Sequence, residues 1–270
     1  MAEPRVRGGK ILLVIVLGCL GCELFLPGEP ARINLGAFSL PPGREYWFGT
    51  DSMGRDIFSM IWYGGRISLL IGAAATFIST VLALVIGALS GMGPEWLDRL
   101  LMYLTDVMLA IPGFLFTLFF QGMWGKRTAI GLAFAIGLTG WPSMARVARM
   151  QVRQIQGSGY VLAAKAMGCS FWHMLWVHLT PGLVSSMMFM VVMNFRNAMV
   201  AEATLSFMGM GLPPESVTWG SMLSLAEDAF LSGAWWVIVI PGSFLIITLL
   251  CVTELGEYLR KRVNPGGSNL

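Results

Sequence analysis

Apolar residues gather into six long runs along the chain, and polar residues gather between them. Each run is near the ~20 residues that an α-helix needs to cross a bilayer. Because backbone polar groups in lipid must be satisfied within their own segment, each run is expected to be a helix. The pattern predicts an all-α integral membrane protein with a third helix kinked at Pro112 and Gly113. The predicted spans are roughly 11–26, 67–91, 97–121, 128–144, 183–200 and 235–255.

The composition agrees with a lipid-embedded chain. Of the 270 residues, 56% are hydrophobic and only 12% are charged, and the mean hydropathy is +0.70. A chain of this size cannot hide so much apolar surface in one water-soluble core. The formal net charge of +3 is what basic cytoplasmic loops produce, so it gives no reason to expect a nucleic-acid partner.

Lys and Arg are distributed unevenly between the two sides of the predicted membrane. If the N-terminus is cytoplasmic, that side receives eleven of the eighteen basic residues and the other side receives six. The positive-inside rule then predicts that both termini and the loop at 145–182 are cytoplasmic. The expected organisation is a tail with a first helix at 1–26, an external segment at 27–66, a five-helix core at 67–256 and a cytoplasmic tail at 257–270.

The cytoplasmic loop contains a stretch polar enough to face water, although it lies between two membrane-length apolar runs. A short alanine-rich helix is expected to begin at Tyr160, and Gly168 is expected to end it as a left-handed cap. Ser170 then starts a second short helix that Pro181 stops before the next span. The first helix would offer the small or polar surface of Ala163, Ala164 and Lys165 for docking. The alternative is an ordinary amphipathic loop.

The external segment carries a compact motif of turn-forming and charged residues. Its members are Gly49, Thr50, Asp51, Gly54, Arg55 and Asp56. The two acids can accept hydrogen bonds from nearby backbone amides, the glycines permit tight turns, and the arginine can bind a carboxylate. We expect a structural staple that orients the start of the second span, in preference to direct substrate binding.

Several polar residues fall within the predicted spans, where an unpaired charge is expensive. Asp106 is expected to form an ion pair with Arg146 or Arg149 at the cytoplasmic end of the fourth span. The residues Asn194, Arg196, Asn197 and Glu202 cluster at the end of the fifth span. Residues of this kind either line a translocation path or serve helix packing, and the sequence leaves both possibilities open.

Five ordered blocks resemble the permease subunits of peptide and nickel ABC importers. Residues 47–58 are similar to the W-x-G-T-D-x-x-G-R-D segment of the "C" subunits of dipeptide, oligopeptide and nickel importers. The loop at 160–181 resembles that family's cytoplasmic "EAA" loop, although Leu162 stands where the family usually has Glu. The remaining similar blocks are 98–112, 201–220 and 256–265.

This resemblance implies a type I importer fold, MetI-like, in the bacterial cytoplasmic (inner) membrane. It also implies a homologous "B" permease partner, two P-loop ATPase subunits and an external substrate-binding protein that delivers small peptides or nickel or other metal complexes. The sequence has no G-x-x-x-x-G-K-[ST] motif, so ATP and Mg²⁺ are expected on the partner ATPases, and the chain is expected to be neither an enzyme nor the carrier of a cofactor.

Two other classes of membrane protein remain as alternatives. A secondary transporter of a small solute would need inverted repeats and a broken helix with ion ligands at the midplane, and neither is clear. An intramembrane enzyme would need paired catalytic groups, whereas the acids within the spans are scattered. Because His173 and His178 both fall in the cytoplasmic loop, no metal site is expected within the membrane.

Overall fold

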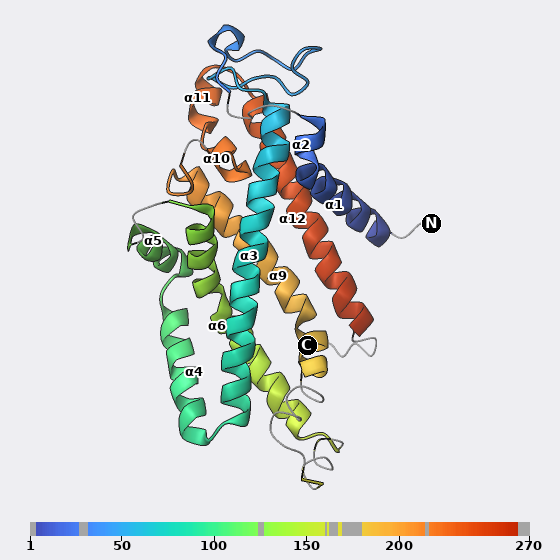
Figure 1. Ribbon diagram of the computed structural model, residues 1–270, viewed down its shortest axis with the longest axis vertical. Coiled ribbons are helices and arrows are strands. Elements are labelled where there is room, and N and C mark those ends of the chain that lie inside the picture. The colour runs from blue at the N-terminus through green and yellow to red at the C-terminus, as the bar shows by residue number, and fades with distance from the viewer. Residues whose placement is uncertain are drawn as a thin grey trace.

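A computed structural model of the chain describes residues 4–26, 32–123, 127–159, 161, 167–168, 180–213 and 216–263. The described part is a bundle of long helices without strands (Figure 1). Its helices are α1 (Pro4–Leu20), α2 (Cys22–Phe25), the 3-10 turn η1 (Leu35–Ala37), α3 (Ile57–Met92), α4 (Glu95–Ala110), α5 (Gly113–Met123), α6 (Ala129–Gln156), α9 (Thr180–Phe207), α10 (Trp219–Leu223), α11 (Ala226–Leu231) and α12 (Trp236–Val263).

Helix α3 runs through the centre of the bundle, with α4 and α5 on one side and α1 and α12 on the other, while α6 crosses behind it (Figure 1). Its most extensive contact is with α6, because small residues cover the buried face of α3 and let the backbones approach. A Cβ added to Gly87 would lie 2.4 Å from the Cβ of Ala148. The small buried residues of α3 include Gly64, Gly65, Ser68, Gly72, Ala75, Ser79, Ala83, Gly87 and Ser90.

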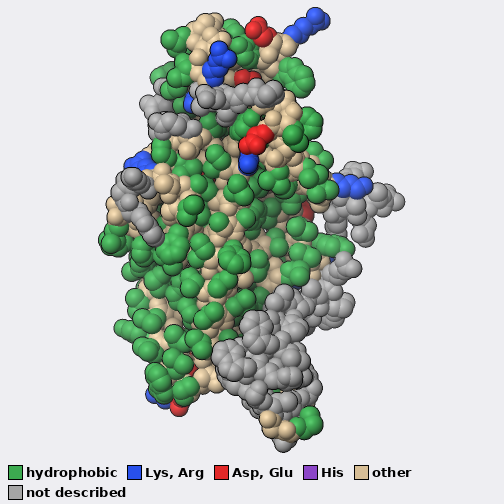
Figure 2. Space-filling view, in the orientation of Figure 1, with side chains coloured by type: hydrophobic (Ala, Val, Ile, Leu, Met, Phe, Trp, Pro, Cys, Tyr) green, Lys and Arg blue, Asp and Glu red, His purple; other side chains and the backbone are tan. Residues whose placement is uncertain are grey.

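Two described helices are long and apolar enough to cross a membrane, at Ile57–Met92 and Trp236–Lys261, and α4 with α5 makes a third candidate if the bent pair is one span. Hydrophobic side chains cover most of the face seen in Figure 2, and charged side chains lie mainly toward its ends. The other three predicted spans are also helical, as α1 with α2, α6 and α9. The total of six spans stays a prediction.

The predicted kink at Pro112 is confirmed, and it is a corner. Helices α4 and α5 meet at an angle of 91°. Ile111 is extended, with φ −96° and ψ 130°, as expected for a residue that precedes proline. The carbonyl of Pro112 accepts from Leu115 N at 2.9 Å, so the proline begins α5. The corner carries α5 away from α4 and across α6 (Figure 1).

The segment predicted to be external and the loop predicted to be cytoplasmic lie at opposite ends of the bundle. The described part of 27–56 covers one end together with α10 and α11, while α6 ends and α9 begins at the other (Figure 1). Trp219 in α10 is fully buried and donates from Nε1 to Ile61 O in α3 at 2.9 Å. This contact anchors α10 to the central helix.

Candidate functional site

The external motif folds around the buried carboxylate of Asp51. Its Oδ1 accepts from the backbone N–H groups of Met53 and Arg55, both at 2.9 Å, and its Oδ2 accepts from Arg55 Nε at 2.7 Å. Both charged side chains are almost completely buried, at 1% and 9% exposure. The predicted pairing of motif acid and arginine is confirmed, and it closes a turn within one segment.

The other motif residues connect this turn to the rest of the protein. Thr50 accepts from Leu40 N at 2.8 Å, and its carbonyl accepts from Trp236 Nε1 in α12 at 3.1 Å. Gly49 and Gly54 have φ angles of +77° and +70°, which favour glycine. Asp56 caps α3 by accepting from Phe58 N at 3.3 Å and Ser59 N at 3.0 Å. These contacts match the staple interpretation, because each one orients backbone at the start of α3.

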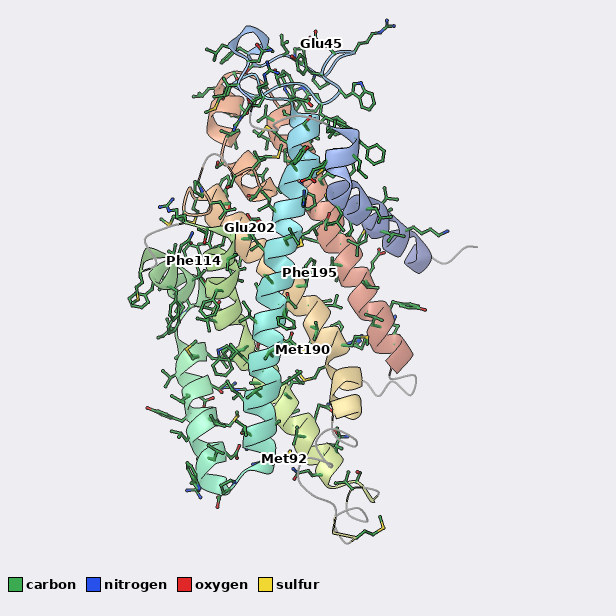
Figure 3. The ribbon with its side chains drawn as sticks, in the orientation of Figure 1. Glu45, Met92, Phe114, Met190, Phe195 and Glu202 are labelled. Carbon is green, nitrogen blue, oxygen red and sulfur yellow. The ribbon has the colours of Figure 1, made fainter. Side chains whose placement is uncertain are left out.

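A cavity of about 490 Å³ lies between α5, α6 and α9, and we call it the α5–α9 cavity. Its walls are apolar side chains interrupted by hydroxyl and amide groups. Phe114, labelled in Figure 3, lines it from α5. None of the described residues that line it carries a charge; the polar ones are Thr117, Thr139, Asn194, Asn197 and Thr204.

Asn194 is the most informative of these groups. Its side chain is largely buried, at 9% exposure, and its Nδ2 has no hydrogen-bond partner among the described residues. A buried amide donor without a partner costs free energy unless water or a ligand satisfies it. A Cβ on Gly140 would lie 3.0 Å from the Oδ1 of Asn194 and 2.7 Å from Ser79 Oγ, so a larger residue there would crowd both side chains. The Nδ2 of Asn194 is therefore a hydrogen-bond donor at the cavity wall that a ligand can occupy.

The structure divides the four polar residues predicted near the end of the fifth span. Asn194 and Asn197 line the α5–α9 cavity, whereas Arg196 and Glu202 do not. Arg196 is half-buried and donates from Nη2 to Asn197 Oδ1 at 3.2 Å. Two of the four predicted residues, Asn194 and Asn197, therefore line the cavity.

Glu202 is fully buried among hydroxyl groups (Figure 3). Ser68 Oγ in α3 donates to its Oε2 at 3.0 Å, and Ser206 Oγ donates to its Oε1 at 2.9 Å. Ser68 Oγ in turn accepts from Trp219 N in α10 at 3.2 Å. Among the described residues, no Lys or Arg pairs with this acid. These contacts join α9, α3 and α10, so they favour the helix-packing alternative for Glu202.

Asp106 pairs with Arg146, one of the two partners predicted for it. Both side chains are exposed on the surface of this chain, Asp106 at 59% and Arg146 at 50%. Neither residue lines the α5–α9 cavity. The pair lies on the shared surface of α4 and α6.

At the end of the bundle that is predicted to be cytoplasmic, a buried charge cluster surrounds Asp98, whose role could not be read from the sequence pattern. Its side chain is 8% exposed. Arg149 Nη2 and Arg153 Nη2 donate to Asp98 Oδ2 at 2.6 and 2.5 Å, and Ser90 Oγ donates to Oδ1. The cluster ties α3, α4 and α6 together. The signal in the sequence is the basic stripe Arg146, Arg149 and Arg153, since residues three and four apart share one helix face.

The predicted docking loop is described only in part. Tyr160, Ala163, Ala164, Lys165 and the proposed start of the second helix at Ser170 lie outside the described residues. Gly168 has a φ of +80°, as predicted for a left-handed position. Pro181 lies in the first turn of α9, where proline is tolerated because no intrahelical donor is needed. Val161 is buried against Val152 of α6 and Met92 of α3, so the base of the loop packs on the bundle.

Comparisons with known proteins agree with this architecture. Residues 83–265 match the family described as "Binding-protein-dependent transport system inner membrane component". The chain is 31% identical over 94% of its length to the dipeptide transport system permease protein DppC of Bacillus subtilis, covering 79% of that protein. It is equally similar over 94% of its length to the oligopeptide transport system permease protein OppC of Bacillus subtilis, covering 83% of it.

The fold also matches a solved structure. A chain of the MetNI methionine ABC transporter, in an inward-facing conformation, superposes with a TM-score of 0.62. The match covers 76% of this chain and 96% of that one at 16% sequence identity, so it shows the fold alone. From this fold and the family match over residues 83–265, the chain belongs to the inner membrane components of binding-protein-dependent transport systems, the permease subunits of ABC transporters.

Proposed function

We propose that this chain forms half of the path by which small peptides cross the membrane, together with a homologous permease subunit. The peptide cargo rests on the names of the relatives at 31% identity, which are dipeptide and oligopeptide permeases. The remaining parts of the assembly would be an external binding protein and two ATPase subunits, as the importer family implies. The inner-membrane family and the basic-residue count support cytoplasmic termini.

The observation that carries the proposal is the α5–α9 cavity. Its hydroxyl and amide groups can exchange hydrogen bonds with peptide groups, which every peptide has whatever its side chains. Because no charged side chain lines it in the part of the chain that the structure describes, the cavity would not select strongly among cargo side chains by charge. Asn194 Nδ2 supplies a buried donor that is still free to bind a passing carbonyl.

The base of the docking loop would transmit the state of the ATPases to this cavity. Arg153, three residues before the end of α6, binds Asp98 of α4, and α4 leads through the corner at Pro112 to α5 and Phe114. A movement of the loop would therefore be carried by α6 and α4 to one wall of the cavity. Such coupling requires that ATP bind one arrangement of the complex better than the other.

The deciding experiment is purification of the tagged full-length chain from its native membrane in mild detergent, followed by mass spectrometry and reconstitution. We expect a second permease and P-loop ATPases to accompany the chain. Labelled di- or tripeptide should enter proteoliposomes only with ATP and the binding protein, and vanadate should stop it. Uptake that persists without ATP and is abolished by an ionophore would refute the proposal and favour a secondary transporter.

Within that assay, Asn194→Leu tests the cavity itself. It removes the unpaired donor while keeping a side chain of similar size. Uptake should fall while ATP hydrolysis and assembly persist. The matched control is Arg196→Gln on the same helix, which lies outside the cavity and should leave uptake near the wild-type rate. Equal uptake by the wild type and both variants would argue against the α5–α9 cavity as the path.

A further inference from the structure

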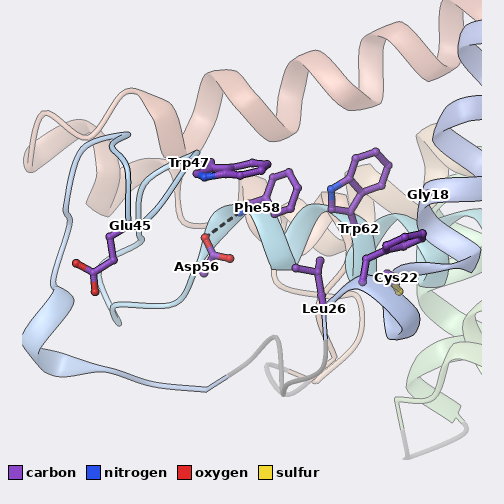
Figure 4. A pocket seen from close by; sticks show the side chains of 9 residues that line it. Gly18, Cys22, Leu26, Glu45, Trp47, Asp56, Phe58 and Trp62 are labelled. Carbon is purple, nitrogen blue, oxygen red and sulfur yellow. Dashed lines mark hydrogen bonds between the residues drawn. The ribbon is translucent and has the colours of Figure 1, made fainter.

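A second cavity, of about 500 Å³, lies at the other side of the bundle, and we call it the rim cavity (Figure 4). It is bounded by α1, α2, the first turns of α3 and the external segment. It shares no lining residue with the α5–α9 cavity. Its occupant is therefore a question separate from the transport path.

The two ends of the rim cavity differ in polarity. Gly18, Leu26 and Trp62 line the end nearest α1, while Glu45 and Asp56 line the opposite end (Figure 4). A cavity with an apolar end and an acidic end is complementary to an amphipathic molecule whose polar end is cationic.

Aromatic rings line the cavity from one end to the other. Trp47 and Phe58 meet edge to face, with ring centroids 5.1 Å apart, and Phe58 meets Trp62 in the same way at 6.2 Å. Tryptophan is the aromatic residue whose face attracts a cation most strongly. It is also enriched where a protein crosses from hydrocarbon to the polar headgroups.

The surroundings place this cavity at the rim of the apolar surface. The neighbouring residues Leu20, Leu24 and Phe25 of α1 and α2 are 54%, 85% and 77% exposed, which suits contact with hydrocarbon. The external segment beyond them exposes Arg44 and Glu45, which suits contact with water. The cavity therefore spans the level at which lipid headgroups lie.

The charges of the lining residues restrict which chemical group the polar end of the cavity can bind. Among the described residues, those that line the rim cavity include two carboxylates and no Lys or Arg, so a cationic group is favoured there over an anionic one. Asp56 also lines a second polar cavity of about 450 Å³, whose walls include Arg32, Asn34 and Tyr46.

We propose that the rim cavity binds one zwitterionic phospholipid with a primary ammonium headgroup, of the phosphatidylethanolamine type, from the external leaflet. The ammonium group lies against Asp56, Glu45 and the face of Trp47. The acyl chain runs along Phe58 and Trp62 toward Gly18. The bound lipid fills the space between α2 and α3 that protein side chains leave open.

Quenching of tryptophan fluorescence by brominated acyl chains tests this site directly. The full-length chain is placed in nanodiscs containing increasing fractions of dibrominated phosphatidylethanolamine or dibrominated phosphatidylglycerol. Subtracting the signal of Trp62→Phe from that of the wild type isolates Trp62. Half-maximal quenching of Trp62 should need about threefold less phosphatidylethanolamine than phosphatidylglycerol, since one cation contact with an aromatic face and carboxylates distinguishes the two lipids.

Matched variants separate a specific site from ordinary lipid contact. Glu45→Gln with Asp56→Asn should abolish the preference, and Asn at position 56 still caps α3. Trp96→Phe serves as the control, because Trp96 is 66% exposed on α4 and outside the cavity; its difference signal should show no preference. Equal quenching of Trp62 by both lipids, or none by either, would overturn the proposal.

Discussion

Replacement of Asp98 tests how α3, α4 and α6 are held together at the end of the bundle that is predicted to be cytoplasmic. Asp98→Ala removes the acceptor of three charge-assisted hydrogen bonds from Arg149 and Arg153 and of one bond from Ser90. Removing one partner of a buried ion pair costs about 3–5 kcal/mol when the other charge stays buried. Here Arg149 is 25% exposed and Arg153 is 49% exposed, so both can regain water, and the expected loss is about 2–3 kcal/mol.

The measurement is reversible unfolding of the full chain in mixed micelles by increasing SDS. Asp98→Asn should lose about half as much stability as Asp98→Ala, because its amide oxygen still accepts. A double-mutant cycle of Asp98→Ala with Arg149→Gln should give a coupling of about 1–3 kcal/mol. In the reconstituted complex, Asp98→Asn should lower peptide uptake per ATP hydrolysed.

The matched control is Glu95→Gln on the same helix. Glu95 pairs with Arg99 at 2.6 Å, but the two side chains are 78% and 74% exposed, and such surface pairs contribute about 0–1 kcal/mol. If Asp98→Ala were no more destabilising than Glu95→Gln, the buried cluster would not hold these helices together. If the ratio of peptide uptake to ATP hydrolysis were unchanged in Asp98→Asn, the Asp98 cluster would have no part in coupling.

Three further substitutions probe the other parts of the molecule. Gly54→Ala should cost about 2–4 kcal/mol by the same unfolding assay, because φ is +70° and the new Cβ would lie 1.8 Å from Asn34 O; Gly43→Ala, whose nearest atom is 3.7 Å away, should be neutral. Glu202→Gln should retain both stability and uptake, whereas Glu202→Leu should cost about 2–4 kcal/mol by leaving hydroxyl groups unpaired; uptake lost in a stable Glu202→Gln protein would instead indicate a transport role. Gly168→Val should leave the bundle folded but uncouple ATP hydrolysis from uptake, since valine disfavours a φ of +80°; unimpaired uptake would count against the docking role.

Interactions between near neighbours could be predicted from the sequence, because a short segment contains all the atoms that make them. Asp51 and Arg55 are four residues apart, and Asp56 caps the helix that follows it. The left-handed Gly168 and the break at Pro112 are likewise properties of one or two backbone positions. The helical class follows from the length and apolarity of the runs, since lipid leaves the backbone few alternatives.

Contacts between distant positions depended on how the helices pack. Glu202 meets Ser68 across 134 positions, and Asp98 meets Arg149 across 51, so helix depth, rotation and crossing decide both. The predicted position along the membrane left two arginines as possible partners of Asp106. The rotation of α6 about its own axis decided that the partner is Arg146. The rotation of α9 about its own axis decided that Asn194 and Asn197 line the α5–α9 cavity while Arg196 does not. The sequence by itself therefore determined which segments are helices and how their ends are built, and only the tertiary structure decided which polar groups meet, because that depends on the mutual fit of whole helix surfaces.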